Sequence, residues 1–159
     1  MFTKYLLTFL ISMVPLVELR GAIPFAASMG LPLPQSYVIA VIGNMLPVPV
    51  IYFFARKVLI WGSDKPYIGK FFRFCLEKGA AGGEKLKKNA GRGLFVALML
   101  FVGIPLPGTG AWTGTLAASL LDMGFRKSVA AVMLGVLLAG ILMSLASAGL
   151  LGALGAVFA

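Results

Sequence analysis

The sequence predicts an all-α integral membrane protein, and two observations support this prediction. Of the 159 residues, 60% are hydrophobic and only 12% are charged, whereas soluble domains carry roughly 25% charged residues. Charge-free runs at 21–55, 93–121 and 128–159 each exceed the roughly 18 apolar residues that indicate a membrane span. Because these runs lack the alternation of a barrel strand, helices are the structures that satisfy their backbone in lipid.

The composition also excludes several functions. The chain has one cysteine, Cys75, and no histidine, so it lacks the residues of an internal disulfide and of the usual zinc sites. We expect no metal and no cofactor, and no catalytic motif in the sequence points to an enzyme. Ten of the 14 basic residues lie within 56–92, which favours a membrane-protein connector over a surface for nucleic acid.

The first half, residues 1–55, is predicted to form a re-entrant hairpin followed by one membrane-spanning helix. The apolar run that begins at Tyr5 stops at Glu18, short of the roughly 20 residues that a helix needs to cross the bilayer. We therefore expect a hairpin over 5–30 and a span over 36–55. Cleavage of the first run as a signal peptide is disfavoured, because charged residues interrupt the approach to the small-residue site.

The second half, residues 93–159, repeats this order of features. A hairpin over 93–121 is broken at Pro105-Leu106-Pro107-Gly108-Thr109-Gly110, and a span follows over 128–151. Superposing Pro15-Leu16 on Pro105-Leu106 places the later segments of the two halves in the same order. We predict one membrane domain, 1–159, built from two inverted repeats, which is the plan of many secondary transporters.

The basic connector at 56–92 predicts the orientation of the chain. Lysine and arginine collect on the cytoplasmic side of a membrane, so we expect 56–92 and 122–127 in the cytoplasm and both termini outside the cytoplasmic (inner) membrane. Residues 66–78 are predicted to form an amphipathic helix on the cytoplasmic leaflet. Its candidates for contact with anionic lipid headgroups are Lys70, Arg73 and Lys78.

A model with four ordinary spans is the alternative to this topology. It would place Glu18 and Arg20 in an interfacial loop, and it would place Arg126 and Lys127 outside, against the usual charge asymmetry. The unequal lengths of the apolar runs also disfavour it.

Glu18 and Arg20 are the first candidates for a functional site. Charged residues at membrane depth are costly unless paired or solvated, and they often mark a transport pathway. A buried carboxylate is able to exchange a proton, and a guanidinium suits phosphate or carboxylate ligands. In the alternative interpretation the two side chains only neutralise each other or lie in interfacial water.

The broken second hairpin supplies further candidates. Proline removes an amide donor and glycine permits unusual backbone conformations, so helix ends with free amides are expected there. Trp112 is equally suited to the bilayer surface, and Asn44 to helix packing. The candidate pathway residues from this hairpin are Pro107, Gly108, Thr109, Gly110, Trp112 and Thr113. Asn44, in the first predicted span, is a further candidate.

Two segments resemble the signatures of the small multidrug export protein family, and the resemblance covers essentially the whole chain. The segments are Val17-Glu18-Leu19-Arg20-Gly21-Ala22-Ile23-Pro24 and Pro105-Leu106-Pro107-Gly108-Thr109-Gly110-Ala111-Trp112-Thr113-Gly114. That family is similar in plan to the DedA (VTT-domain) superfamily. Members of that superfamily carry two re-entrant hairpins that face one another, and they are implicated in proton-dependent lipid movement, including flipping of polyprenyl phosphate carriers.

The resemblance also suggests roles for single residues. It implies that Glu18 matches the acid of the first hairpin and Pro107-Gly108 the Pro-Gly of the second. The DedA arginine after Pro-Gly has no counterpart, because Thr109 and Gly110 stand in its place. Anion binding would then depend on Arg20 and backbone amides, with Arg92 or Arg126 at the cytoplasmic edge.

These features predict a secondary transporter or flippase for a small amphipathic, lipid-phosphate-like anion, proton-coupled through Glu18. A cationic drug exporter and a non-transporting membrane assembly protein are the alternatives. The expected partners are the bilayer and an anionic lipid or small-molecule substrate, and no nucleic acid. Stripes of small residues, Gly140-Ser144-Ala148-Gly152 or Ala131-Gly135-Ala139, leave a homodimer open.

Overall fold

The computed structural model describes residues 1–71, 73–74, 77, 93–106, 108–121 and 123–158. Every regular element in these ranges is helical, which confirms the predicted all-α class. The elements are α1 (Phe2–Met13), α2 (Glu18–Ser28), α3 (Leu33–Met45), α4 (Val48–Val50), the π-helix η1 (Ile51–Ala55), α5 (Arg56–Ser63), α7 (Leu94–Gly103), α8 (Ala111–Leu120) and α9 (Phe125–Phe158).

Two long helical stretches form the axis of the bundle. Leu33–Phe54 and Phe125–Leu150 are long and apolar enough to cross a membrane. α1 and α7 are also apolar, but α1 has 12 residues and α7 has 10. At about 1.5 Å per residue neither reaches across a hydrocarbon core about 30 Å thick.

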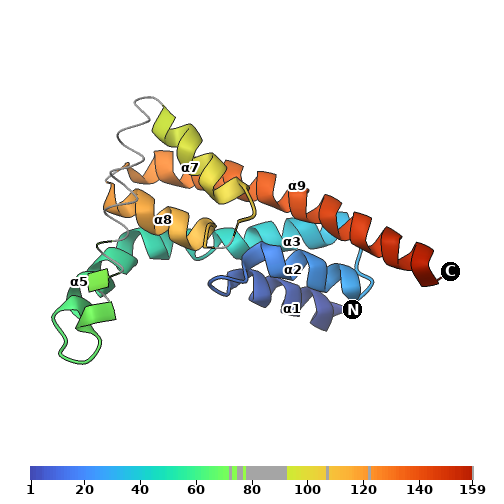
Figure 1. Cartoon of the computed structure of the whole chain (residues 1–159), viewed down its shortest axis with the longest axis horizontal. Helices are drawn as coiled ribbons and strands as arrows, with labels where there is room; N and C mark the ends of the chain where they lie inside the picture. The colour runs from blue at the N-terminus through green and yellow to red at the C-terminus, as the bar shows by residue number, and fades with distance from the viewer. Residues whose placement is uncertain (72, 75–76, 78–92, 107, 122, 159) are drawn as a thin grey trace.

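The short helices form two hairpins that meet near the middle of the bundle. Figure 1 shows α1 running inward from the end that holds both termini and α2 returning to that end. It shows α7 running inward from the opposite end and α8 returning to that end, where α5 also lies. The turn of each hairpin therefore lies near the centre of the long helices.

Local sequence explains where the first long stretch starts and bends. α3 begins at Leu33, three residues before the predicted position, because Pro34 lies in the first helical turn, where a missing N–H breaks no helical bond. After Pro47 and Pro49 the chain forms the π-helix η1. The hydroxyl of Ser119 on α8 donates to the Tyr52 carbonyl of η1 at 2.8 Å, which joins the bend to the second hairpin.

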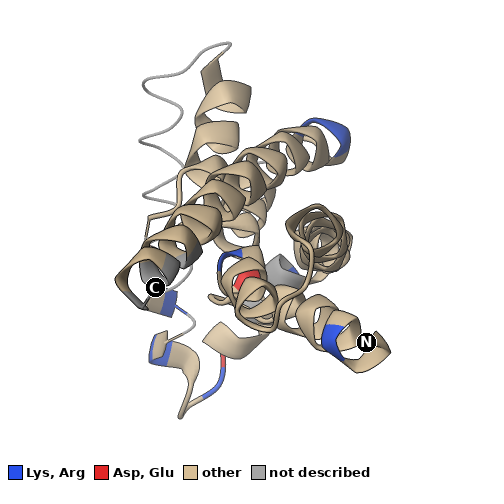
Figure 2. Cartoon of the chain, turned by 90° about the vertical axis from the view of Figure 1, so that its right-hand side faces the viewer, with Lys and Arg blue, Asp and Glu red and all other residues tan. Residues whose placement is uncertain are grey.

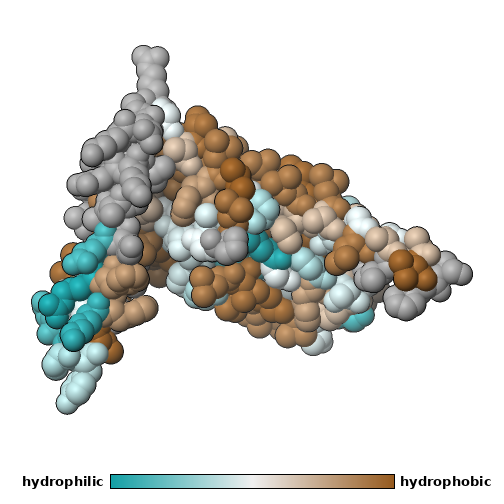
Figure 3. All heavy atoms as spheres, in the orientation of Figure 1, coloured by the Kyte–Doolittle hydropathy of each residue, from teal (hydrophilic) through white to brown (hydrophobic). Residues whose placement is uncertain are grey.

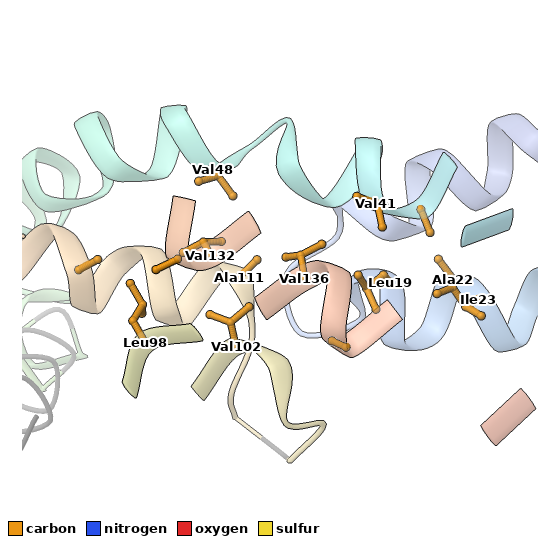
Figure 4. Packing of buried hydrophobic residues seen from close by; sticks show 14 residues of the cluster. Leu19, Ala22, Ile23, Val41, Val48, Leu98, Val102, Ala111, Val132 and Val136 are labelled. Atoms are coloured by element: carbon orange, nitrogen blue, oxygen red, sulfur yellow. The ribbon is translucent and has the colours of Figure 1, made fainter. Parts of the chain in front are cut away.

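A single cluster of buried side chains joins both hairpins to the long helices. Leu19, Ala22 and Ile23 of α2 and Leu98 and Val102 of α7 belong to it, and all are at most 1% exposed. Figure 4 shows them with residues of α3, α4, α8 and α9. On the face shown in Figure 3, apolar side chains also cover much of the exterior. Hydrophilic residues gather at the α5 end, and a second, smaller hydrophilic patch lies near the centre. An apolar exterior is the surface expected of a bundle in lipid.

Close packing of α7 on α9 depends on a glycine. A Cβ at Gly135 would lie 2.6 Å from the Met99 carbonyl oxygen and 2.7 Å from Val102 Cβ. Gly135→Ala is therefore expected to lower the free energy of unfolding by about 1–3 kcal/mol, measured by thermal unfolding in detergent. Gly149→Ala on the same helix is the matched control, because nothing lies within 4 Å of its added Cβ. Equal melting temperatures for the two variants would contradict this packing.

The small-residue stripes have different environments. Ala131, Gly135 and Ala139 are buried inside the chain, so this stripe packs on the chain's own helices and not toward a second copy. In the other stripe, a Cβ at Gly140 would lie 2.4 Å from the Tyr37 ring. The N-terminal end of that stripe therefore also packs against the chain's own α3.

The predicted amphipathic helix at 66–78 is described in part. Residues 69–71, 73–74 and 77 are helical, and residues 66–68 form a turn. Lys70 and Arg73 are exposed, and Arg73 Nε donates to the Gly69 carbonyl at 3.3 Å. Lys78 lies outside the described residues. Along the bundle axis in Figure 2, charged residues are sparse within the helices.

Candidate functional site

Glu18 is the first residue of α2 and directs its carboxylate to the other hairpin. It is 4% exposed. Its Oε2 accepts a hydrogen bond from the Ala111 amide at 3.2 Å, and its Oε1 accepts one from the Trp112 amide at 3.1 Å. These amides belong to the first turn of α8, where helical N–H groups have no partner within the helix. Glu18 therefore caps the N-terminus of α8 from a distant part of the chain.

Arg20 caps a helix C-terminus, that of α7. Its Nη1 donates to the Leu106 and Thr109 carbonyls, each at 2.7 Å. Its Nη2 donates to the Val102 and Ile104 carbonyls at 3.2 Å and to Thr109 Oγ1 at 2.9 Å. These oxygens belong to the last turn of α7 and to the loop that follows it, and carbonyls at a helix C-terminus lack helical partners. A single guanidinium thus holds the whole break of the second hairpin.

Opposite charges therefore match opposite helix ends. A helix N-terminus carries about half a positive charge and a C-terminus about half a negative charge, so Glu18 and Arg20 each lie at the end they stabilise. The hydrogen bonds of both side chains go to the second hairpin, those of Glu18 to α8 and those of Arg20 to the end of α7 and the α7–α8 loop. The two side chains connect the hairpin tips.

The backbone beside the Glu18 carboxylate has an unusual conformation at two residues. Leu16 and Glu18 have φ angles of 70° and 52°, in the left-handed region that costs non-glycine residues of the order of 1 kcal/mol each. Strain of this kind persists where surrounding contacts fix it, and it is common at functional sites. At Glu18 the contacts of the carboxylate with α8 accompany this conformation.

Gly110 permits the close approach of the Glu18 carboxylate. Its φ is 148°, and an added Cβ would lie 2.6–2.9 Å from the carboxylate atoms. Gly108 has a φ of 78°, but nothing lies within 4 Å of its added Cβ. The backbone conformation favours glycine at both positions, and at Gly110 the nearby carboxylate also leaves no room for a Cβ.

Gly110→Ala is therefore expected to displace Glu18 and to lower the free energy of unfolding by about 2–4 kcal/mol. Gly108→Ala should cost only about 1 kcal/mol, from backbone strain alone. Thermal unfolding of the two variants side by side measures the difference. A Gly108→Ala variant as unstable as Gly110→Ala would show that strain, and not contact with the carboxylate, decides both.

A cavity of about 410 Å³ lies where the hairpin tips meet. Both charged residues line it, and most of its other lining is apolar. The lining residues are Pro15, Leu16, Glu18, Arg20, Ile51, Pro105, Leu106, Gly108, Thr109, Trp112, Thr113 and Leu116. A mostly apolar cavity with a few convergent polar groups is the usual form of a small-molecule site.

The cavity brings together most of the residues that the sequence predicts for a pathway. Glu18, Arg20, Gly108, Thr109, Trp112 and Thr113 line it, and Gly110 contacts the Glu18 carboxylate. Asn44 is not among the lining residues; it is 1% exposed within the bundle, and its Oδ1 has no hydrogen-bond partner among the described residues. Pro107 lies outside the described residues.

Sequence reasoning missed the apolar part of the site. Pro15 and Leu16 line it from the first hairpin turn, Ile51 from the π-helix and Leu116 from α8. For Pro15 and Leu16 a signal was present, since they align with Pro105 and Leu106 of the second half. Ile51 and Leu116 carried none, because apolar residues on helices give no sign of which cavity they border.

The fold and the site define a small helical membrane protein with two helices of membrane-spanning length and a charged, cavity-lining junction between two short hairpins. Residues 18–142 match the family model described as "Putative small multi-drug export protein", and the chain belongs to this family. The family description indicates export, a transport activity and not an enzymatic one. Neither the curated proteins nor the solved structures contain a match to this chain.

Proposed function

We propose that this protein is a secondary transporter that moves a small amphipathic anion across the membrane together with a proton, with the central cavity as its binding site. In this proposal Leu33–Phe54 and Phe125–Leu150 span the bilayer. The α1–α2 and α7–α8 hairpins re-enter from opposite faces as inverted repeats. Support comes from the lengths of the helices and from the meeting of the hairpin tips at the centre of the bundle.

The charge balance of the site supports proton coupling. The Glu18 carboxylate and the N-terminus of α8 leave about half a negative charge, and the Arg20 guanidinium and the C-terminus of α7 leave about half a positive charge. The four groups therefore sum to nearly zero. A charged molecule entering this mostly apolar cavity needs a compensating change, because uncompensated charge in such surroundings is costly.

Protonation of Glu18 is the smallest change that provides this compensation. Only two hydrogen bonds hold Glu18, whereas five hold Arg20. A neutral Glu18 leaves Arg20 and the amides of α8 with a net positive charge, which favours an anion in the cavity. Loss of the proton restores the carboxylate, which competes with the anion for the same amides and expels it.

The observation that carries the proposal is the cavity lined by both charged residues at the junction of the two hairpins. The test is flux into proteoliposomes of the purified protein, with n-alkyl phosphates and n-alkyl trimethylammonium salts as probes under an imposed pH gradient. We expect uptake of the phosphate probe to rise with the gradient and to be accompanied by proton movement. Binding of the probes without flux would contradict transport and favour a membrane assembly role.

Export of a cation is the second candidate. Each Glu18 oxygen accepts one amide hydrogen bond and keeps further acceptor capacity at the cavity, while the terminal nitrogens of Arg20 already donate to oxygens of the second hairpin. A cation would bind by displacing the Glu18 proton. Flux of the ammonium probe against a proton gradient, without flux of the phosphate probe, would establish this mechanism instead.

A further inference from the structure

A second apolar cavity adjoins the central one. It has a volume of about 340 Å³, and its seven lining residues are all apolar or aromatic. Ile51, Trp112 and Leu116 line both cavities. The two spaces therefore lie on either side of the same three side chains of η1 and α8.

The outer part of this second cavity faces away from the bundle core. Pro47, Val50, Phe54 and Val58 line it without touching the central cavity. Val50, Phe54 and Val58 are 58%, 57% and 50% exposed. We call this space, with its seven lining residues, the lateral groove. It runs from α4 along η1 to α5.

Trp112 marks the junction of the two spaces. Its backbone amide donates to Glu18, and its ring lines both cavities. Its indole Nε1 is buried and has no hydrogen-bond partner among the described residues. Trp112 thus connects the Glu18 carboxylate to the walls of both spaces.

We propose that the lateral groove holds the apolar tail of a single-chain amphiphile whose polar head lies in the central cavity near Trp112. This inference rests on the proposed function and names the class of its substrate. The three side chains that the groove shares with the charged cavity favour such a ligand over a helix of a second copy, because a helix about 10 Å wide does not fit a cavity of this volume. The groove thus provides lateral entry from the lipid.

The substrate's alkyl length tests this inference. Trp61→Phe leaves Trp112 as the only tryptophan of the chain's two, so its fluorescence reports ligand at the junction. In this background we expect affinity for n-alkyl phosphates, referred to the free probe in water, to rise about fourfold per added methylene, the gain that corresponds to removal of each CH₂ from water. The n-alkyl trimethylammonium series should show the same dependence if the head group is cationic.

In the same background, Val58→Phe and Val50→Phe should fill the groove from its outer part and remove the gain for the longer chains, while affinity for the shortest probe stays within about twofold. Val96→Phe is the matched control, because Val96 is 47% exposed and lines neither cavity. An unchanged length dependence in both groove variants, or no response of Trp112 to any probe, would overturn the inference. A normal length dependence of binding without pH-driven flux would instead contradict only the proposed transport.

Discussion

Glu18→Gln is expected to abolish flux driven by a pH gradient while the protein stays folded. The carboxamide has the size of the carboxylate but carries no proton between the two sides, so it fixes the site in its neutral form. Its NH₂ group also faces one of the two amide donors of α8, and the loss of one hydrogen bond should lower the free energy of unfolding by about 1–2 kcal/mol. Flux and thermal unfolding of the same preparation separate the two effects.

Glu18→Asp is the control for this change. Aspartate keeps the exchangeable proton, but its shorter side chain reaches Ala111 and Trp112 less well, so reduced flux that still responds to the pH gradient is expected. Binding of the phosphate probe should persist in Glu18→Gln, because the site then keeps the positive charge of Arg20. A Glu18→Gln protein with wild-type, pH-dependent flux would remove Glu18 from the mechanism.

Arg20→Ala is expected to have the largest effect on stability. It leaves the Val102, Ile104, Leu106 and Thr109 carbonyls without the donor that joins them. Hydrogen bonds to a charged group contribute about 1.5–3 kcal/mol each and are not additive when they share one side chain. We expect a loss of about 3–5 kcal/mol in the free energy of unfolding, measured as a fall in the melting temperature in detergent.

Arg20→Lys separates charge from geometry. Lysine keeps the positive charge but presents one ammonium in place of the planar fork, so it should reach fewer of the four carbonyls and give an intermediate stability. If Arg20→Lys has the melting temperature of the wild type, the positive charge alone accounts for the role of Arg20. If Arg20→Ala also has the melting temperature of the wild type, the guanidinium does not stabilise the second hairpin.

Much of the site's composition was predictable from the sequence. Charges within an apolar run are costly, so Glu18 and Arg20 were evident candidates. The break after Pro105 followed from proline and glycine chemistry. The helical class followed from the apolar runs alone.

The partners of these residues were not predictable. Arg20 bonds to carbonyls 82–89 positions away, and Glu18 to amides 93 and 94 positions away. Only tertiary structure brings such groups together. Almost every residue has the same backbone amide and carbonyl, so the sequence does not show which of them a side chain will bind. The same limit applies to the π-helix after Pro49, whose Tyr52 carbonyl is satisfied by Ser119 from the second half.

The opposed entry of the two hairpins is the central claim, and single-cysteine labelling in intact cells tests it most directly. In a Cys75→Ser background, Gln35→Cys and Lys127→Cys place exposed probes at the starts of α3 and α9, directly after the α1–α2 and α7–α8 hairpins. The account predicts that an impermeant thiol reagent labels Gln35→Cys from outside, and labels Lys127→Cys only after the cells are opened. Labelling of Lys127→Cys from outside would contradict it, because the second hairpin would then cross the membrane and its tip could not meet the first at the centre.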